Sequence, residues 1–67
     1  MSFRVTVLIQ KEENWYVAKC VENSVASQGK TIDEAMINLH EALELYYEDN
    51  KPEIQPPPLI TTMEVTV

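Results

Sequence analysis

The chain has 67 residues and a formal net charge of −6, from eleven acidic and five basic residues. This length predicts a single domain over residues 1–67, and so short a chain buries only about 60% of the surface that its unfolded form exposes. Cys20 is the one cysteine, so an internal disulfide is excluded, and with one histidine the chain has too few ligands for a structural zinc site. The acidity disfavours nucleic acid, whose binding needs clustered Lys and Arg. We therefore expect an acidic domain without metal or cofactor, stabilised by self-association and suited to a basic partner.

The first half of the sequence has the alternating pattern of β-strands. Residues 3–10 and 15–21 each alternate apolar and polar side chains, which predicts two strands, and the polar residues 11–14 between them predict a hairpin turn. The polar residues 22–24 then interrupt the pattern, and residues 25–28 are predicted to form a short third strand.

A helix is predicted after the only glycine of the chain, Gly29, for which we expect a positive φ. Thr31 and Glu34 have the spacing of a capping box, in which each side chain satisfies a free backbone N–H at the start of the helix. Apolar residues then recur at three- and four-residue steps, as on one face of a helix of four to five turns. These residues are Ile32, Ala35, Met36, Leu39, Ala42, Leu43 and Tyr46. Pro52 is expected to end the helix, because its ring is incompatible with helix continuation.

The C-terminal part predicts a final strand. Ile54 to Pro58 includes three consecutive prolines and is expected to be extended, whereas residues 59–67 alternate again. The predicted fold is α+β, in the order β-β-β-α-β, with a four-stranded sheet of order 3-2-1-4 and one helix on one face. The helix-free face would expose an apolar patch that invites self-association into a dimer or tetramer. We assign to this face Leu8, Tyr16, Ala18, Cys20 and Ile60.

Residues 25–48 resemble the HicB family of antitoxins. The segments VASQGKTIDEA and NLHEALELYYE are similar to the family pattern S-x-G-x-T-x-x-E-A that runs into a helix reading N-L-x-E-A-L-E-L-Y. The resemblance implies a degenerate ribonuclease H-like fold and a cytoplasmic antitoxin, which covers a small basic HicA-like toxin that cleaves mRNA. Longer members of the family carry a DNA-binding domain after the last strand. This sequence reads as the short form, so we expect no direct nucleic acid binding by this chain alone.

The candidate partner-binding residues are at the end of the predicted helix. Glu44, Glu48 and Asp49 stand where the helix dipole is already negative, which costs stability and is typical of a functional surface, with Tyr47 as an aromatic contact beside them. The alternative is a solvated helix end kept acidic for solubility. Trp15 is either an interface anchor or part of the packing of the sheet.

Two functions remain open at this level. The first is the antitoxin, and the alternative is an orphan HicB-like homo-oligomer with no toxin partner and an unknown ligand. We expect no enzymatic activity, because two-metal phosphoryl chemistry needs several convergent carboxylates and the interiors of the predicted strands hold none. A basic chain encoded by the neighbouring reading frame would favour the antitoxin.

Overall fold

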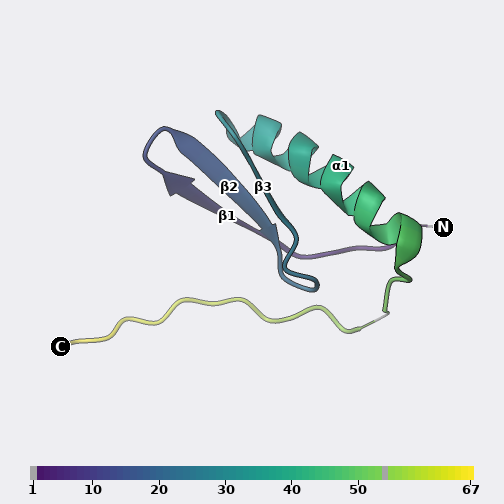
Figure 1. Ribbon diagram of the computed structural model, residues 1–67. Helices are drawn as coiled ribbons and strands as arrows, with labels where there is room; N and C mark the ends of the chain where they lie inside the picture. Colours follow the sequence, from purple (N-terminus) through teal and green to yellow (C-terminus); the bar gives the residue numbers. More distant parts are fainter. Residues whose placement is uncertain (1, 54) are drawn as a thin grey trace.

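The computed structural model describes residues 2–53 and 55–67 and has the element order β-β-β-α. Its elements are β1 (Val7–Glu12), β2 (Trp15–Cys20), β3 (Ala26–Gly29) and α1 (Ile32–Asp49). The three strands form one antiparallel sheet in the order β1-β2-β3, and α1 lies across one face of it (Figure 1). The predicted hairpin, third strand and helix are therefore confirmed as elements.

The hairpin between β1 and β2 is tighter than the sequence predicted. β1 begins at Val7 rather than at Phe3 and continues to Glu12, which pairs with Trp15. Only Glu13 and Asn14 form the turn, and Glu13 has a φ of 50°. Two-residue loops with a positive φ match the twist of the flanking strands, so pairing extends as far as the turn allows.

The predicted start and end of α1 are confirmed. The Glu34 N–H donates a hydrogen bond to the Thr31 hydroxyl at 3.0 Å, so Thr31 is the N-cap. The Glu34 carboxylate accepts from the Lys30 N–H at 3.3 Å, one residue earlier than the capping box predicts. At the other end, the Asn50 amide donates to the Tyr46 carbonyl at 2.7 Å and satisfies a C-terminal carbonyl that the helix leaves free.

The prediction of a positive φ at Gly29 was wrong. Residues with a positive φ are Glu13 and Ser24, and Gly29 is not among them. Gly29 is instead a site of close approach between β3 and the first turn of α1. A Cβ placed on Gly29 would stand 2.6 Å from the backbone nitrogen of Ala35 and 2.8 Å from the carbonyl carbon of Glu34, so no larger residue fits.

The core lies between α1 and the sheet and is built from small residues. Ala18, Cys20 and Ala35 are completely buried, and Leu39 is the largest buried side chain. Around this centre pack the partly buried residues Val7, Tyr16, Val25 and Leu43. Small side chains on both surfaces let the helix approach closely, and α1 packs on β3 and β2.

The predicted helix-free apolar patch was wrong for Tyr16, Ala18 and Cys20, which lie on the face that α1 covers. The register explains the error. Ile9 pairs with Ala18 and Leu8 pairs with Lys19, so Leu8 and Ala18 point to opposite faces, because side chains alternate along each strand. Leu8 does lie on the open face and is exposed, as predicted, but Ile60 lies in the C-terminal segment rather than on the sheet.

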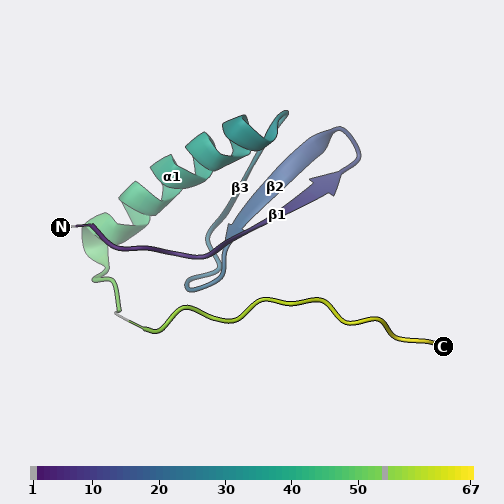
Figure 2. The ribbon, with the colours of Figure 1, turned by 180° about the vertical axis from the view of Figure 1, so that it is seen from behind.

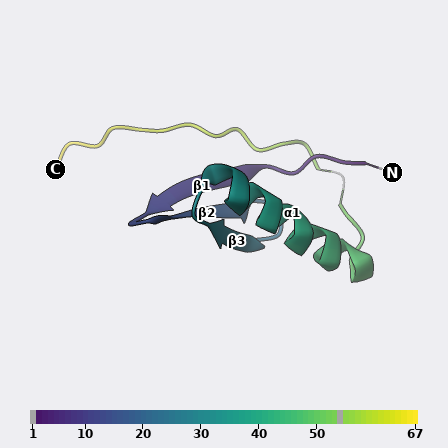
Figure 3. The same cartoon turned by 90° about the horizontal axis from the view of Figure 1, so that it is seen from above.

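The predicted fourth strand and the sheet order 3-2-1-4 were also wrong. Residues 59–67 are extended but form no strand, and they pass the sheet without joining it in all three views (Figures 1, 2 and 3). The prolines at 56–58 lack backbone N–H groups and stiffen the chain leading into this segment, which disfavours a return onto the sheet. Ile54, predicted to be extended with them, lies outside the described residues. The resulting three-stranded α+β fold gives no indication of the ribonuclease H-like architecture that the resemblance implied.

Candidate functional site

The negative charge of the protein is concentrated on α1. The helix contains six acidic residues and no lysine or arginine, whereas the rest of the chain has five acidic and five basic residues. The acidic residues of the helix are Asp33, Glu34, Glu41, Glu44, Glu48 and Asp49. All six side chains are exposed. The formal charge of −6 is therefore the charge of one helix surface, which we call the acidic helix face.

Two large apolar side chains lie among these acids. Ile37 is 61% exposed and Leu45 is 66% exposed, although both belong to a well-formed helix with a buried side formed by Ala35 and Leu39. Solvated helix faces are normally polar. A face that combines acidic and apolar side chains offers both electrostatic attraction and apolar contact, which are the two components of a protein interface.

The C-terminal end of α1 carries the strongest electrostatic conflict. The last turn contains Glu48 and Asp49 and no basic residue, although the helix dipole favours cations there. Glu44 has a neighbouring polar partner, because its carboxylate lies 2.9 Å from Nδ1 of His40. Both side chains of this pair are mostly exposed, so it contributes little to stability and charge remains available at the surface.

Tyr47 anchors the end of the helix to the sheet. Its hydroxyl accepts a hydrogen bond from the Asn23 amide at 2.9 Å, across 24 residues of sequence. Its ring also packs edge to face against Phe3, with the ring centroids 4.8 Å apart. Tyr47 was predicted as an aromatic partner contact beside the acidic residues, and that role remains a prediction. In the structure its hydroxyl and one side of its ring bond and pack inside the molecule, so Tyr47 also fixes where the acidic residues around it lie.

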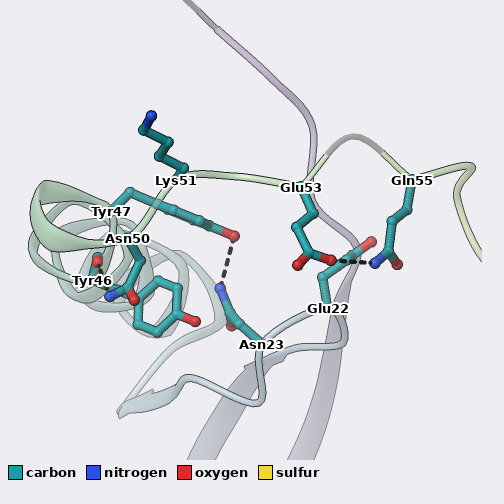
Figure 4. A pocket seen from close by; sticks show the side chains of 8 residues that line it. All are labelled: Glu22, Asn23, Tyr46, Tyr47, Asn50, Lys51, Glu53 and Gln55. Carbon is teal, nitrogen blue, oxygen red and sulfur yellow. Dashed lines mark hydrogen bonds between the residues drawn. The ribbon is translucent and has the colours of Figure 1, made fainter.

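A polar hollow of about 280 Å³ adjoins this anchor (Figure 4). Its lining residues are Glu22, Asn23, Tyr46, Tyr47, Asn50, Lys51, Glu53 and Gln55. Several of their polar groups already bond to one another, since Gln55 donates to Glu53 at 2.8 Å and Asn23 donates to Tyr47. The carboxylates of Glu22 and Glu53 extend the acidic character of the helix end around its C-terminus.

Glu22 and Asn23 were not predicted as part of this site. The Glu22 carboxylate accepts the Thr6 N–H at 2.8 Å, and this hydrogen bond lowers the pKa of Glu22 below its usual value. Asn23 Oδ1 accepts the Val25 N–H at 3.0 Å while Ser24 has a φ of 63°. The sequence signal for this turn was the polar break at 22–24, since Asn is frequent where a side chain replaces a backbone partner.

Trp15 lies far from the acidic end of α1. It begins β2 at the hairpin, opposite Glu12, whereas the C-terminus of α1 lies at the other end of the molecule (Figures 1 and 2). Its side chain is 42% exposed and borders a shallow hollow with Val17 and Gln28. The structure therefore brings together Glu44, Tyr47, Glu48 and Asp49 but leaves Trp15 as a separate feature of the open sheet face.

The described residues offer little support for a metal site, a reactive thiol or a membrane-spanning helix. Within residues 2–53 and 55–67, no three His, Cys, Asp or Glu side chains converge in a way that would hold a metal ion. Cys20 is buried, and its thiol donates to the Glu22 carboxylate at 3.7 Å. In the same described part, α1 is not apolar enough to cross a membrane.

Comparison with known proteins places the chain in a family. Searches among curated proteins and among solved structures gave no match. A family model described as a family of unknown function (DUF7387) matches residues 4–65, which is nearly the whole chain and includes all three strands and α1. The chain therefore belongs to the DUF7387 family of unknown function.

Proposed function

We propose that this protein is a cytoplasmic antitoxin of the HicB type, and that its acidic helix face binds and occludes a small basic mRNA-cleaving HicA-like toxin. The observation that carries the proposal is the location of the whole net charge on the exposed side of one helix. An RNA-cleaving toxin needs a basic surface to hold the phosphate backbone of its substrate. An acidic helix of about 27 Å, given 1.5 Å per residue, is long enough to occupy such a surface in place of RNA.

The motif that resembles the HicB family supports the partner in a specific way. Gly29, Thr31 and Glu34 have structural roles, at the close approach to α1 and at its N-cap, and these say little about function. Glu41, Glu44 and Leu45 belong to the same motif but are exposed, and the packing of α1 on the sheet does not require them. Residues that match the family pattern but have no role in folding support a role of this helix in binding a partner.

The test is the association kinetics with the toxin. A basic chain encoded beside this gene would be co-expressed with the protein, purified as a complex and then used in binding measurements. The double variant Glu44→Lys, Glu48→Lys alters the acidic helix face, and Glu12→Lys, Glu64→Lys is its matched control. Both variants change the formal net charge from −6 to −2, because each exchange adds two charges.

The proposal predicts that the helix variant associates several-fold more slowly than the control, since charges at an interface act chiefly on the association rate. Equal rates for both variants would mean that only total charge matters, and would contradict binding through α1. Absence of any complex would favour the alternative, an orphan homo-oligomer. That alternative is itself supported by the exposed apolar side chains Leu8 and Trp15 on the open sheet face and by the exposed C-terminal segment.

A further inference from the structure

Residues 59–67 have the sequence of a strand and the exposure of an unpaired segment. Leu59 is 100% exposed and Met63 is 86% exposed, and Val65 and Val67 are exposed as well. Six of the nine residues are Ile, Val or Thr, which favour extended backbone. A monomer gains nothing from presenting this many apolar side chains to water. The segment therefore needs a partner surface.

The edge of β1 provides such a surface. Within the described residues, β1 pairs with β2 only, so the backbone groups on its other edge are free to bond another strand. The adjacent apolar surface is also incomplete, because α1 packs on β3 and β2. Ile9 on β1 is 40% exposed although it points to the helix side of the sheet, and Met36 on α1 is 38% exposed.

The two rows of side chains in the segment fit the two faces of this edge. The row Leu59, Thr61, Met63, Val65 and Val67 is mostly apolar and matches the helix side, where Val7 and Ile9 lie. The other row contains Ile60, Thr62, Glu64 and Thr66. Its three polar members match Gln10 and Glu12 on the open face, and Ile60 is apolar like Leu8 on that face. A strand placed beside β1 in this orientation covers Ile9 and leaves the carboxylate of Glu64 in water.

We infer that the partner surface is β1 of a second copy, so that two chains exchange residues 59–67 and form a dimer. In each copy the chain turns back after α1, and residues 59–67 run past the sheet but remain apart from their own β1 (Figures 1 and 3). Exchange is reciprocal in a two-fold dimer, so both segments and both edges are paired at once. This inference is independent of the proposed function, because α1 keeps its acidic face exposed.

Light scattering with size-exclusion chromatography tests the inference on the full chain. We expect the wild-type protein to have about twice the mass of the 7.7 kDa chain at micromolar concentration. Met63→Glu, Val65→Glu places charges in the row that faces the helix side, and it should yield a monomer. Thr62→Glu, Thr66→Glu adds the same charge to the other row and should leave the dimer intact. Circular dichroism should show the same helix content in all three proteins, because residues 59–67 do not contribute to the folded unit of a single copy.

Hydrogen exchange adds a test that needs no variant. In the wild-type dimer, every second amide of residues 60–66, those on the edge that bonds to β1, should exchange slowly, and in the Met63→Glu, Val65→Glu monomer these amides should exchange at the rate of an unstructured chain. A monomeric wild type would overturn the inference, whether or not these amides are protected. So would a dimer in which they exchange freely, a dimer that persists in the Met63→Glu, Val65→Glu variant, or a control variant that dissociates equally.

Discussion

Gly29 lies against the first turn of α1, where an added Cβ would stand 2.6 Å from the backbone nitrogen of Ala35. That contact is with backbone, which cannot rotate away, so Gly29→Ala must push the helix from the sheet. We expect a loss of about 1–3 kcal/mol, as for other overpacked sites, and a lower melting temperature by thermal circular dichroism. Lys30→Ala, at an exposed position next in the chain, is the control and should melt close to wild type. Equal melting of the two variants would contradict the close approach.

Tyr47→Phe tests whether this residue is an anchor. The variant keeps the ring that packs on Phe3 but removes the hydroxyl that accepts from Asn23. The Asn23 amide then loses a partner in a partly buried position. The free energy of unfolding, measured by urea denaturation, should therefore fall by about 0.5–1.5 kcal/mol. If Tyr47 were only a contact for a partner, the unfolding midpoint would not change and toxin binding alone would weaken.

Glu22 makes the stability of the protein depend on pH. The Thr6 N–H lowers the pKa of Glu22 in the folded state, so the folded protein holds this proton less strongly than the unfolded chain does. The stabilisation is therefore present above the usual pKa of a glutamate and is lost as the pH falls through the lowered value. At pH 7, the Glu22→Gln variant should unfold at a lower urea concentration than wild type. The difference between the two unfolding midpoints should shrink towards pH 3. A difference that is constant over this range would mean that the carboxylate charge is not responsible.

Local signals in the sequence were sufficient for most of the elements. The two ends of α1 depend on Thr31 and Asn50, which act within four residues of their partners, and the N-cap was therefore readable from spacing. The clustering of acidic residues on α1 was also predictable from local sequence, since these residues lie on one helix. Non-local relationships were not readable. The face to which Ala18 points depends on its pairing with Ile9 across the hairpin, and strand-like residues at 59–67 do not specify which edge pairs with them.

The polar part of the site shows the same limit. Glu22 and Asn23 read as a simple break between strands, because their partners are 16 and 24 residues away, at Thr6 and Tyr47. Only the folded chain brings the N-terminal segment, the β2–β3 loop and the end of α1 together. A turn rich in Glu and Asn predicts polarity but not the identity of the groups that it will meet.

Glu44→Lys, Glu48→Lys separates a functional acidic surface from a solvated one. Lysine near the C-terminus of a helix interacts favourably with the dipole, and the variant also removes the repulsion between two carboxylates four residues apart. It loses the Glu44–His40 pair, but exposed pairs contribute at most about 1 kcal/mol. We therefore expect the variant to be as stable as wild type or more stable in thermal unfolding.

Binding should change in the opposite direction. Association of this variant with a basic toxin should be several-fold slower than that of wild type, and raising the salt concentration should reduce the difference, because the Debye length is about 8 Å at physiological ionic strength. Slower association together with undiminished stability would identify the end of α1 as a surface maintained for binding at the expense of folding. Identical association kinetics of the variant and wild type at low salt would instead mean that these acids are only solvated. The toxin contact would then lie at Trp15 and the open face of the sheet, and Trp15→Ala would be the next variant to measure.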